Sequence, residues 1–220
     1  MELDPPVSRI RWSDTCRLIP SRYPTTGILD RIARRRDLPL LFELEAWTND
    51  RVSGELSVLH SIPAAEWVTG PQSTVVMAAW CHPRPAGGRF NSSARGAWYC
   101  ARKLETAHAE IAWHRAGELA EIGVFETRMQ MRLYLADFNA SFHDVRGAGK
   151  YHDPASYRDS QELAARLLDA ESNGVVYRSV RHPGGECIAC FRPRLVTLGR
   201  PSAHFEYTWS GTREPSIRRL

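Results

Sequence analysis

The stretch "GGRFNSSARGAWYCARKLETAHAE" (residues 87–110) decides the fold, because it places a turn, a strand and the start of a helix in direct succession. Its glycine pair predicts a turn. "GAWYCA" (96–101) predicts a buried strand. The segment "ETAHAEIAWHRAGELAE" (105–121) is rich in alanine, the strongest helix former, and predicts a helix.

Three side chains in this stretch have the chemistry to bind a ligand that carries phosphate, sugar and a heterocycle. Arg89 follows two glycines, which let backbone approach a ligand closely, and a guanidinium can bind phosphate through two parallel hydrogen bonds. Tyr99 offers a flat face and a hydroxyl group. Glu110 lies inside the predicted helix, where a partly buried carboxylate can stabilise developing positive charge or hold a sugar hydroxyl. Spacing alone favours a simpler interpretation, in which these residues are a solvated arginine, a core tyrosine and a surface glutamate.

Outside this stretch, strands and helices mix without strict alternation, which predicts an α+β fold. Further helices are predicted at 27–37, 38–51 and 159–174, the last with a capping box of Asp159 and Glu162 and a stop at Asn173-Gly174. Strands are predicted at the start of 16–27, at "TVVMAAWC" (74–81), and at 129–138, 175–180, 186–191 and 204–209; 143–157 is predicted as a polar loop.

Length and composition set the class of protein. The 220 residues suit one domain, and 43% hydrophobic with 25% charged residues is ordinary for a globular protein. No apolar run approaches the ~20 residues of a membrane span, and the start "MELDPP" lacks the features of a secretory signal, so we expect a cytoplasmic protein without a membrane partner. The five cysteines fit reduced thiols. The net charge of +4, which comes mostly from arginine, slightly favours an anionic ligand.

Several familiar kinds of site are not expected. "GAGKYH" (147–152) lacks the third glycine of a Rossmann fingerprint, and its spacing is too short for a P-loop. Cys187 and Cys190 form a C-x-x-C pair that would point to opposite faces of a strand, so buried thiols are favoured over a metal site. His108 and His114 form no ligand cluster and are interpreted as surface or packing residues. The basic runs are not interleaved with aromatic residues, so direct nucleic-acid binding is not expected.

The motifs together resemble a known family. "GRFN…AWYCA…ETAHAE", followed by "GVVYRSVRHPGGECIACFRP", is similar to the RES-domain toxins of bacterial Xre–RES toxin–antitoxin pairs, in the subgroup with an extended N-terminal region. Arg89, Glu110 and Ser179 match the arginine, glutamate and serine that give the family its name, and Tyr99 matches the aromatic residue of its motif strand. The sequence departs from many relatives at Arg178, where proline is more usual.

This resemblance implies a fold and an activity. It implies a single RES-like domain over 1–220, with an N-terminal extended region at 1–86 and a motif core at 87–200. The fold would be related to the ADP-ribosyltransferases, with central sheets flanked by helices. The activity would be cleavage of the bond between nicotinamide and ribose in NAD+, with the ADP-ribose passed to a protein side chain, to water or to phosphate, and without a metal.

The resemblance also assigns roles. Arg22, with Tyr23 beside it, and Arg89 would hold the phosphates of NAD+; Arg17 is the alternative to Arg22. Tyr99 would stack on the nicotinamide end. Glu110 would engage the nicotinamide ribose, and Ser179 would position the ribose or the nicotinamide amide.

The implied partner is an Xre-type helix-turn-helix antitoxin that blocks the NAD+ site. Two alternatives from other classes remain open at this point. One is a non-enzymatic module that uses its arginines to bind a phosphorylated ligand or an acidic protein. The other is a nucleic-acid enzyme or binder, for which affinity would fall steeply with salt.

Overall fold

The computed structural model describes residues 3–21, 62–196 and 199–220 of the chain. The helices predicted at 27–37 and 38–51 lie outside these residues, as do Arg22 and Tyr23. No helix in the described part of the chain combines the length and the hydropathy that crossing a membrane requires.

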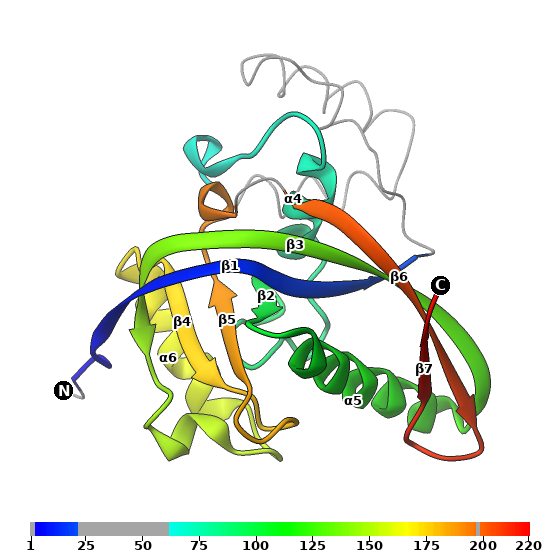
Figure 1. The fold of residues 1–220 in the computed structure, drawn as a ribbon. Helices are drawn as coiled ribbons and strands as arrows, with labels where there is room; N and C mark the ends of the chain where they lie inside the picture. The colour runs from blue at the N-terminus through cyan, green and yellow to red at the C-terminus, as the bar shows by residue number, and fades with distance from the viewer. Residues whose placement is uncertain (1–2, 22–61, 197–198) are drawn as a thin grey trace, which may run out of the picture.

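Within the described residues, seven strands form one continuous sheet (Figure 1). In chain order they are β1 (Val7–Pro20), β2 (Trp98–Ala101), β3 (Glu126–Asp144), β4 (Gly174–Arg178), β5 (Glu186–Cys190), β6 (Arg200–Ser210) and β7 (Ser216–Arg219). Their spatial order is β1-β2-β5-β4-β3-β6-β7, and all adjacent pairs are antiparallel except β3–β4.

The sheet curls back on itself, because β1 pairs with β3 as well as with β2. Strands β1, β2, β5, β4 and β3 therefore form a closed ring of hydrogen-bonded neighbours. The other half of β3 pairs with β6, from which β7 extends. Closure pairs both edges of these strands and fixes the short strands β2, β4 and β5, which carry or flank the motif residues.

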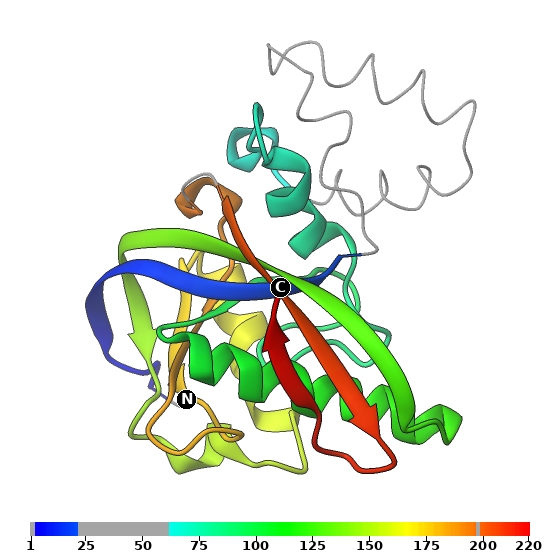
Figure 2. The same cartoon turned by 45° about the vertical axis from the view of Figure 1, so that its right-hand side comes forward.

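Helices cover both sides of the curled sheet. α4 (Ser73–Cys81) lies on one side, and α5 (Leu104–Ile122) and α6 (Arg158–Asp169) lie on the other (Figures 1 and 2). Two hydrophobic clusters match this arrangement: α4 packs into one, and the inner faces of α5 and α6 pack into the other. Short 3-10 turns occupy Ala64–Glu66, Gly149–His152 and Pro193–Leu195. The chain is thus one α+β domain, as the mixed pattern predicts.

The structure corrects three local predictions. "TVVMAAWC" forms helix α4 rather than a strand. A short apolar run has no periodicity that separates a buried strand from a helix buried on most sides, as α4 is. α6 has Tyr157 at its N-cap without a side-chain cap bond, so the expected capping box is absent, and it ends at Asp169 rather than near Gly174. The segment 143–157 is not a continuous loop, because it includes the end of β3 and a 3-10 turn.

The other strand predictions and the helix at 105–121 are confirmed. α5 ends where Gly123 adopts a left-handed conformation (φ 69°), which favours glycine and terminates helices. β7 was not predicted, since all four of its residues are exposed and the segment lacks an alternating pattern.

Candidate active site

The turn that carries Arg89 is held rigidly by the motif tyrosine. The backbone N–H of Phe90 donates to the Tyr99 hydroxyl, and that hydroxyl donates to Oδ1 of Asn91, both at 2.8 Å. A Cβ atom on Gly88 would lie 2.8 Å from the same hydroxyl, so only glycine fits there. The Tyr99 hydroxyl is therefore a structural lock on the arginine turn, while the residue as a whole remains partly exposed.

Gln161 of α6 holds the same turn from its other side. Its amide nitrogen lies 3.0, 2.9 and 3.2 Å from the carbonyl oxygens of Ala86, Gly88 and Asn91. One amide group thus serves three backbone acceptors of the turn. The sequence offers no indication of this contact, because the acceptors are backbone atoms that every residue has.

The Arg89 guanidinium is buried beside α6, with 6% of the residue exposed. Its Nη1 donates to the carbonyl oxygens of Tyr151 (3.1 Å) and Asp153 (2.8 Å), and its Cζ lies 4.7 Å from the ring centroid of Tyr157. Its buried Nη2 has no hydrogen-bond partner among the described residues. A buried cation bonded only to carbonyls, with a donor left over, is well arranged to bind an anion.

Glu110 and Ser179 meet across the site. The Ser179 hydroxyl donates to Oε1 of Glu110 at 2.6 Å. It also accepts the backbone N–H groups of Arg181 (3.1 Å) and His182 (3.0 Å). The serine oxygen is therefore fixed by two donors, and its proton is directed at the carboxylate.

The environment of Glu110 makes its carboxyl group less acidic than usual. Burial raises the pKa of Glu110, and the Ser179 hydrogen bond and the charges of Arg181 and Arg89 oppose that rise. The effect of burial is the largest of these, and the net shift of the pKa is upward. Glu110 is thus a desolvated acid whose charged form depends on its immediate partners.

A second arginine lies near this acid. Arg181 follows the serine motif; its Nη2 donates to the carbonyl oxygen of Pro154 at 2.8 Å, and its Cζ lies 3.4 Å from the ring centroid of Trp113. Trp113 lies one turn beyond Glu110 on α5 and is 40% exposed. The sequence analysis missed Arg181, although it stands two residues after Ser179 in the quoted motif.

His114, next to Trp113, is held in its neutral form. Nη1 of Arg84 donates to Nδ1 of His114 at 2.7 Å, and burial together with the nearby arginines lowers the pKa of His114 to about 3. His114 therefore packs within the site without titrating near neutral pH. His108 contacts Tyr207 and packs against Phe205, in agreement with its interpretation as a packing residue.

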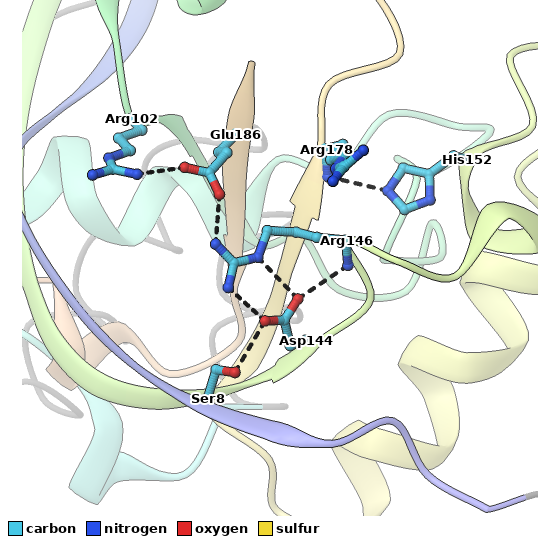
Figure 3. A network of polar contacts seen from close by, with 7 residues as sticks. All are labelled: Ser8, Arg102, Asp144, Arg146, His152, Arg178 and Glu186. Atoms are coloured by element: carbon cyan, nitrogen blue, oxygen red, sulfur yellow. Dashed lines mark hydrogen bonds and ion pairs between the residues drawn. The ribbon is translucent and has the colours of Figure 1, made fainter. Parts of the chain in front are cut away.

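His152 connects the two halves of the site. Its Nε2 accepts the backbone N–H of Arg178 at 3.1 Å, and its Nδ1 bonds to the carbonyl oxygen of Ala148 at 2.9 Å (Figure 3). Burial lowers the pKa of His152, which favours the neutral ring that this pair of bonds requires. His152 lies between the two residues whose carbonyls bind Arg89, and Arg178 precedes Ser179, so this imidazole ties the arginine side to the serine side.

An ion-pair network links strands β1, β3 and β5 near the contact between His152 and Arg178. Arg146 pairs with Glu186 on β5 and with Asp144 on β3, both at 2.5 Å (Figure 3). Glu186 also accepts from Arg102, and Ser8 of β1 donates to Asp144. These contacts cross-link β1, β3 and β5 and lower the pKa values of Asp144 and Glu186.

Arg17 is a partly buried residue of β1, next to the motif strand. Its Nη1 donates to the carbonyl oxygen of Tyr99 at 3.0 Å, and its Cζ lies 4.7 Å from the ring of Trp98. Burial lowers the pKa of Arg17 to about 10, so it remains charged at neutral pH. Of the two arginines considered for the N-terminal phosphate contact, only this one falls within the described residues.

The structure thus pairs Glu110 with Ser179, and the charge of Arg89 acts on the same carboxyl group. Tyr99 is bound to the turn that carries Arg89. Cys187 and Cys190 are both buried, and burial raises the pKa values of both thiols, in agreement with their interpretation as core residues. Across the described ranges, no group of three histidine, cysteine or acidic side chains is arranged to hold a metal ion.

Comparison with known proteins gives three findings. The sequence model of a family described as "RES domain" matches residues 59–210. An uncharacterized protein of Sinorhizobium fredii (strain NBRC 101917 / NGR234), y4oC, is 28% identical over 199 residues, which cover 90% of this chain and 83% of that protein. The crystal structure of the M. tuberculosis MbcT–MbcA toxin–antitoxin complex matches with a TM-score of 0.48 and 14% identity, over 88% of this chain and 85% of the matched chain.

Proposed function

The chain belongs to the RES domain family, and on that basis we propose that it is an NAD+-consuming toxin that cleaves the bond between nicotinamide and ribose. The observation that carries the proposal is the convergence of a buried, carboxylate-free guanidinium with a desolvated acid. Arg89 has no ion-pair partner in the described part of the chain, and Glu110 is bonded to a fixed serine nearby.

The chemistry of this bond suits such a site. In NAD+ the nicotinamide is a pyridinium cation, so it takes the electron pair of the breaking C–N bond and departs as a neutral molecule. No acid is needed to protonate the leaving group. What the transition state requires is negative charge near the ribose, where an oxocarbenium ion develops. The carboxylate of Glu110 supplies that charge.

Ser179 and Arg89 would act on either side of the reacting sugar. The Ser179 hydroxyl orients the carboxylate and helps to keep it ionised, which adds to the ribose or amide contact that the resemblance implies. Arg89 would bind a phosphate oxygen through its unpartnered Nη2. Tyr99 would present its partly exposed side chain to the nicotinamide while its hydroxyl holds the turn. Arg22 with Tyr23, or Arg17, would supply the N-terminal contact.

The fate of the ADP-ribose forms the second part of the proposal. A protein side chain, water or phosphate can each attack the ribose carbon after nicotinamide has left, and the first step is common to all three. The test uses NAD+ labelled in its adenylate half, incubated with the protein and a cell lysate. Label on a discrete protein band means transfer to a protein, whereas label in ADP-ribose or its phosphorylated form means transfer to water or phosphate.

A non-enzymatic phosphate-binding module is the second candidate, and the unpartnered Arg89 donor is the observation in its favour. It predicts binding of ADP-ribose without release of nicotinamide. The labelled-NAD+ experiment separates the two candidates, since a binding module leaves the NAD+ intact.

The family also suggests a partner. We propose an Xre-type helix-turn-helix antitoxin that covers the NAD+ site. Co-expression of the chain with the product of an adjacent reading frame of that class should restore growth to cells that the chain alone arrests. Growth arrest that persists with such a product bound would contradict this part of the proposal.

A further inference from the structure

We propose that Arg181 is a second guanidinium of the substrate site, and that it binds the diphosphate of NAD+ together with Arg89. The inference rests on the proposed function, since it names the group of the substrate that this arginine contacts. It adds a residue that the family motif of arginine, glutamate and serine does not assign.

One short segment, residues 153–154, holds both guanidinium groups. Nη1 of Arg89 donates to the carbonyl oxygen of Asp153, and Nη2 of Arg181 donates to the carbonyl oxygen of Pro154, each at 2.8 Å. Consecutive residues are about 3.8 Å apart along the backbone. Two cations bound to neighbouring carbonyls are therefore held within reach of one diphosphate.

Each of the two guanidinium groups also lies against an aromatic ring. Cζ of Arg181 lies 3.4 Å from the ring centroid of Trp113, and Cζ of Arg89 lies 4.7 Å from that of Tyr157. An aromatic ring occupies one face of a planar guanidinium and leaves its N–H edges available. With one edge on a carbonyl and one face on a ring, each group keeps donors for an anion.

The charges of both guanidinium groups are available to an anion. In the described ranges neither Arg89 nor Arg181 forms an ion pair with a carboxylate. The charges of both arginines act on Glu110, but the hydrogen bond that this acid accepts comes from Ser179. The same two arginines also contribute to the field that keeps His114 neutral. Two cations without carboxylate partners match the two negative charges of a diphosphate.

A different role for Arg181 makes a different prediction. If Arg181 served only to keep Glu110 ionised, its removal would lower kcat and shift the pH profile, and the affinity for ADP-ribose would not change. If Arg181 binds diphosphate, its removal weakens the binding of ADP-ribose directly, because ADP-ribose carries the diphosphate but no nicotinamide.

The test compares Arg181→Ala, Arg181→Lys and the control Arg178→Ala by calorimetric titration with ADP-ribose. Arg178 lies three residues earlier, and its variant removes the same formal charge. Its side chain is exposed, and its bond to His152 is made by the backbone N–H, which alanine keeps. We expect Arg181→Ala to weaken the binding of ADP-ribose on the order of 10- to 100-fold, since hydrogen bonds to charged groups contribute that much to affinity. Arg181→Lys should weaken this binding less, and Arg178→Ala should keep the affinity within about twofold of wild type.

In steady-state kinetics with NAD+, Arg181→Ala should raise KM more than it lowers kcat. Equal ADP-ribose affinities for wild type and Arg181→Ala, with both proteins folded, would overturn the inference. Equal losses in Arg181→Ala and Arg178→Ala would overturn it as well, because they would reflect net charge alone. A wild-type protein that binds ADP-ribose but releases no nicotinamide would contradict the proposed function. The ADP-ribose affinities of wild type and Arg181→Ala would then still decide whether Arg181 binds the diphosphate.

Discussion

Ser179 donates its hydroxyl proton to Glu110 across 2.6 Å, and this contact joins the end of strand β4 to the middle of helix α5. The serine oxygen is at the same time fixed by the backbone N–H groups of Arg181 and His182. The acid that the proposed chemistry needs is therefore oriented by a group that cannot rotate freely.

Removing this serine should shift the pH dependence of activity. Burial raises the pKa of Glu110 and the Ser179 bond lowers it, so Ser179→Ala leaves the pKa still higher. The carboxylate must be ionised to act, and activity is lost as the pH falls through this pKa. The acid limb of kcat/KM should thus lie above the usual glutamate value of about 4.3 and move to higher pH in Ser179→Ala.

The measurement is kcat/KM for NAD+ from pH 4 to pH 8 (roughly the range over which glutamate and histidine titrate) for both proteins. His114 does not account for an acid limb in this range, because its pKa is about 3. An acid limb at the same pH in both proteins would mean that the serine does not tune the acid.

Tyr99→Phe should weaken the arginine turn while it keeps the aromatic ring. The variant leaves the Phe90 N–H and Oδ1 of Asn91 without the hydroxyl that they bond, which should lower the free energy of unfolding by about 1–3 kcal/mol and raise KM for NAD+. Denaturant unfolding and steady-state kinetics measure the two effects. Full stability and an unchanged KM would show that the ring alone carries the role of this tyrosine.

Gln161→Leu should loosen the same turn from the α6 side. Three carbonyl oxygens of the turn lose the contact with the Gln161 amide, so we expect a loss of about 1–3 kcal/mol in stability and a higher KM with kcat less affected. The matched control is Arg158→Ala on the same helix, whose ion pair with Glu162 is exposed and should contribute no more than about 0.5 kcal/mol. Equal effects of the two changes would contradict a specific role for Gln161.

Much of the fold follows from local sequence pattern. The alanine-rich run that forms α5 and the short strands around Tyr99 and Ser179 have the composition of their elements. Helix α4 does not, because it is apolar on almost every side and packs into the hydrophobic cluster, which removes the periodicity that distinguishes a helix. The closure of the sheet between β1 and β3 depends on pairings more than 100 residues apart, which no local pattern encodes.

The site was predictable to a different extent. Arg89, Glu110 and Ser179 carry distinctive side chains in recognisable motifs, and in the structure Ser179 is bonded to Glu110 while the charge of Arg89 acts on the same carboxyl group. The parts that were missed act through the backbone: the carbonyls of 151–154 hold two arginines, and Gln161 binds three carbonyls of the turn. Backbone acceptors are the same for every residue type, so only the fold reveals them.

The most direct test of the central claim is nicotinamide release from NAD+ by wild type and by Glu110→Gln. Glutamine keeps the shape of the side chain and removes its charge. Because the raised pKa of Glu110 means that the folded state binds the proton more tightly than the unfolded chain, stability is lost as pH rises through that pKa, and the glutamine variant avoids this loss.

We therefore expect Glu110→Gln to melt at the same temperature as wild type or higher at neutral pH, while its rate of nicotinamide release falls by at least about 100-fold, as for loss of a major electrostatic contact to a transition state. Wild type should release one nicotinamide for each NAD+ consumed. A folded Glu110→Gln variant that releases nicotinamide at the wild-type rate, or a wild-type protein that leaves NAD+ intact, would contradict the account.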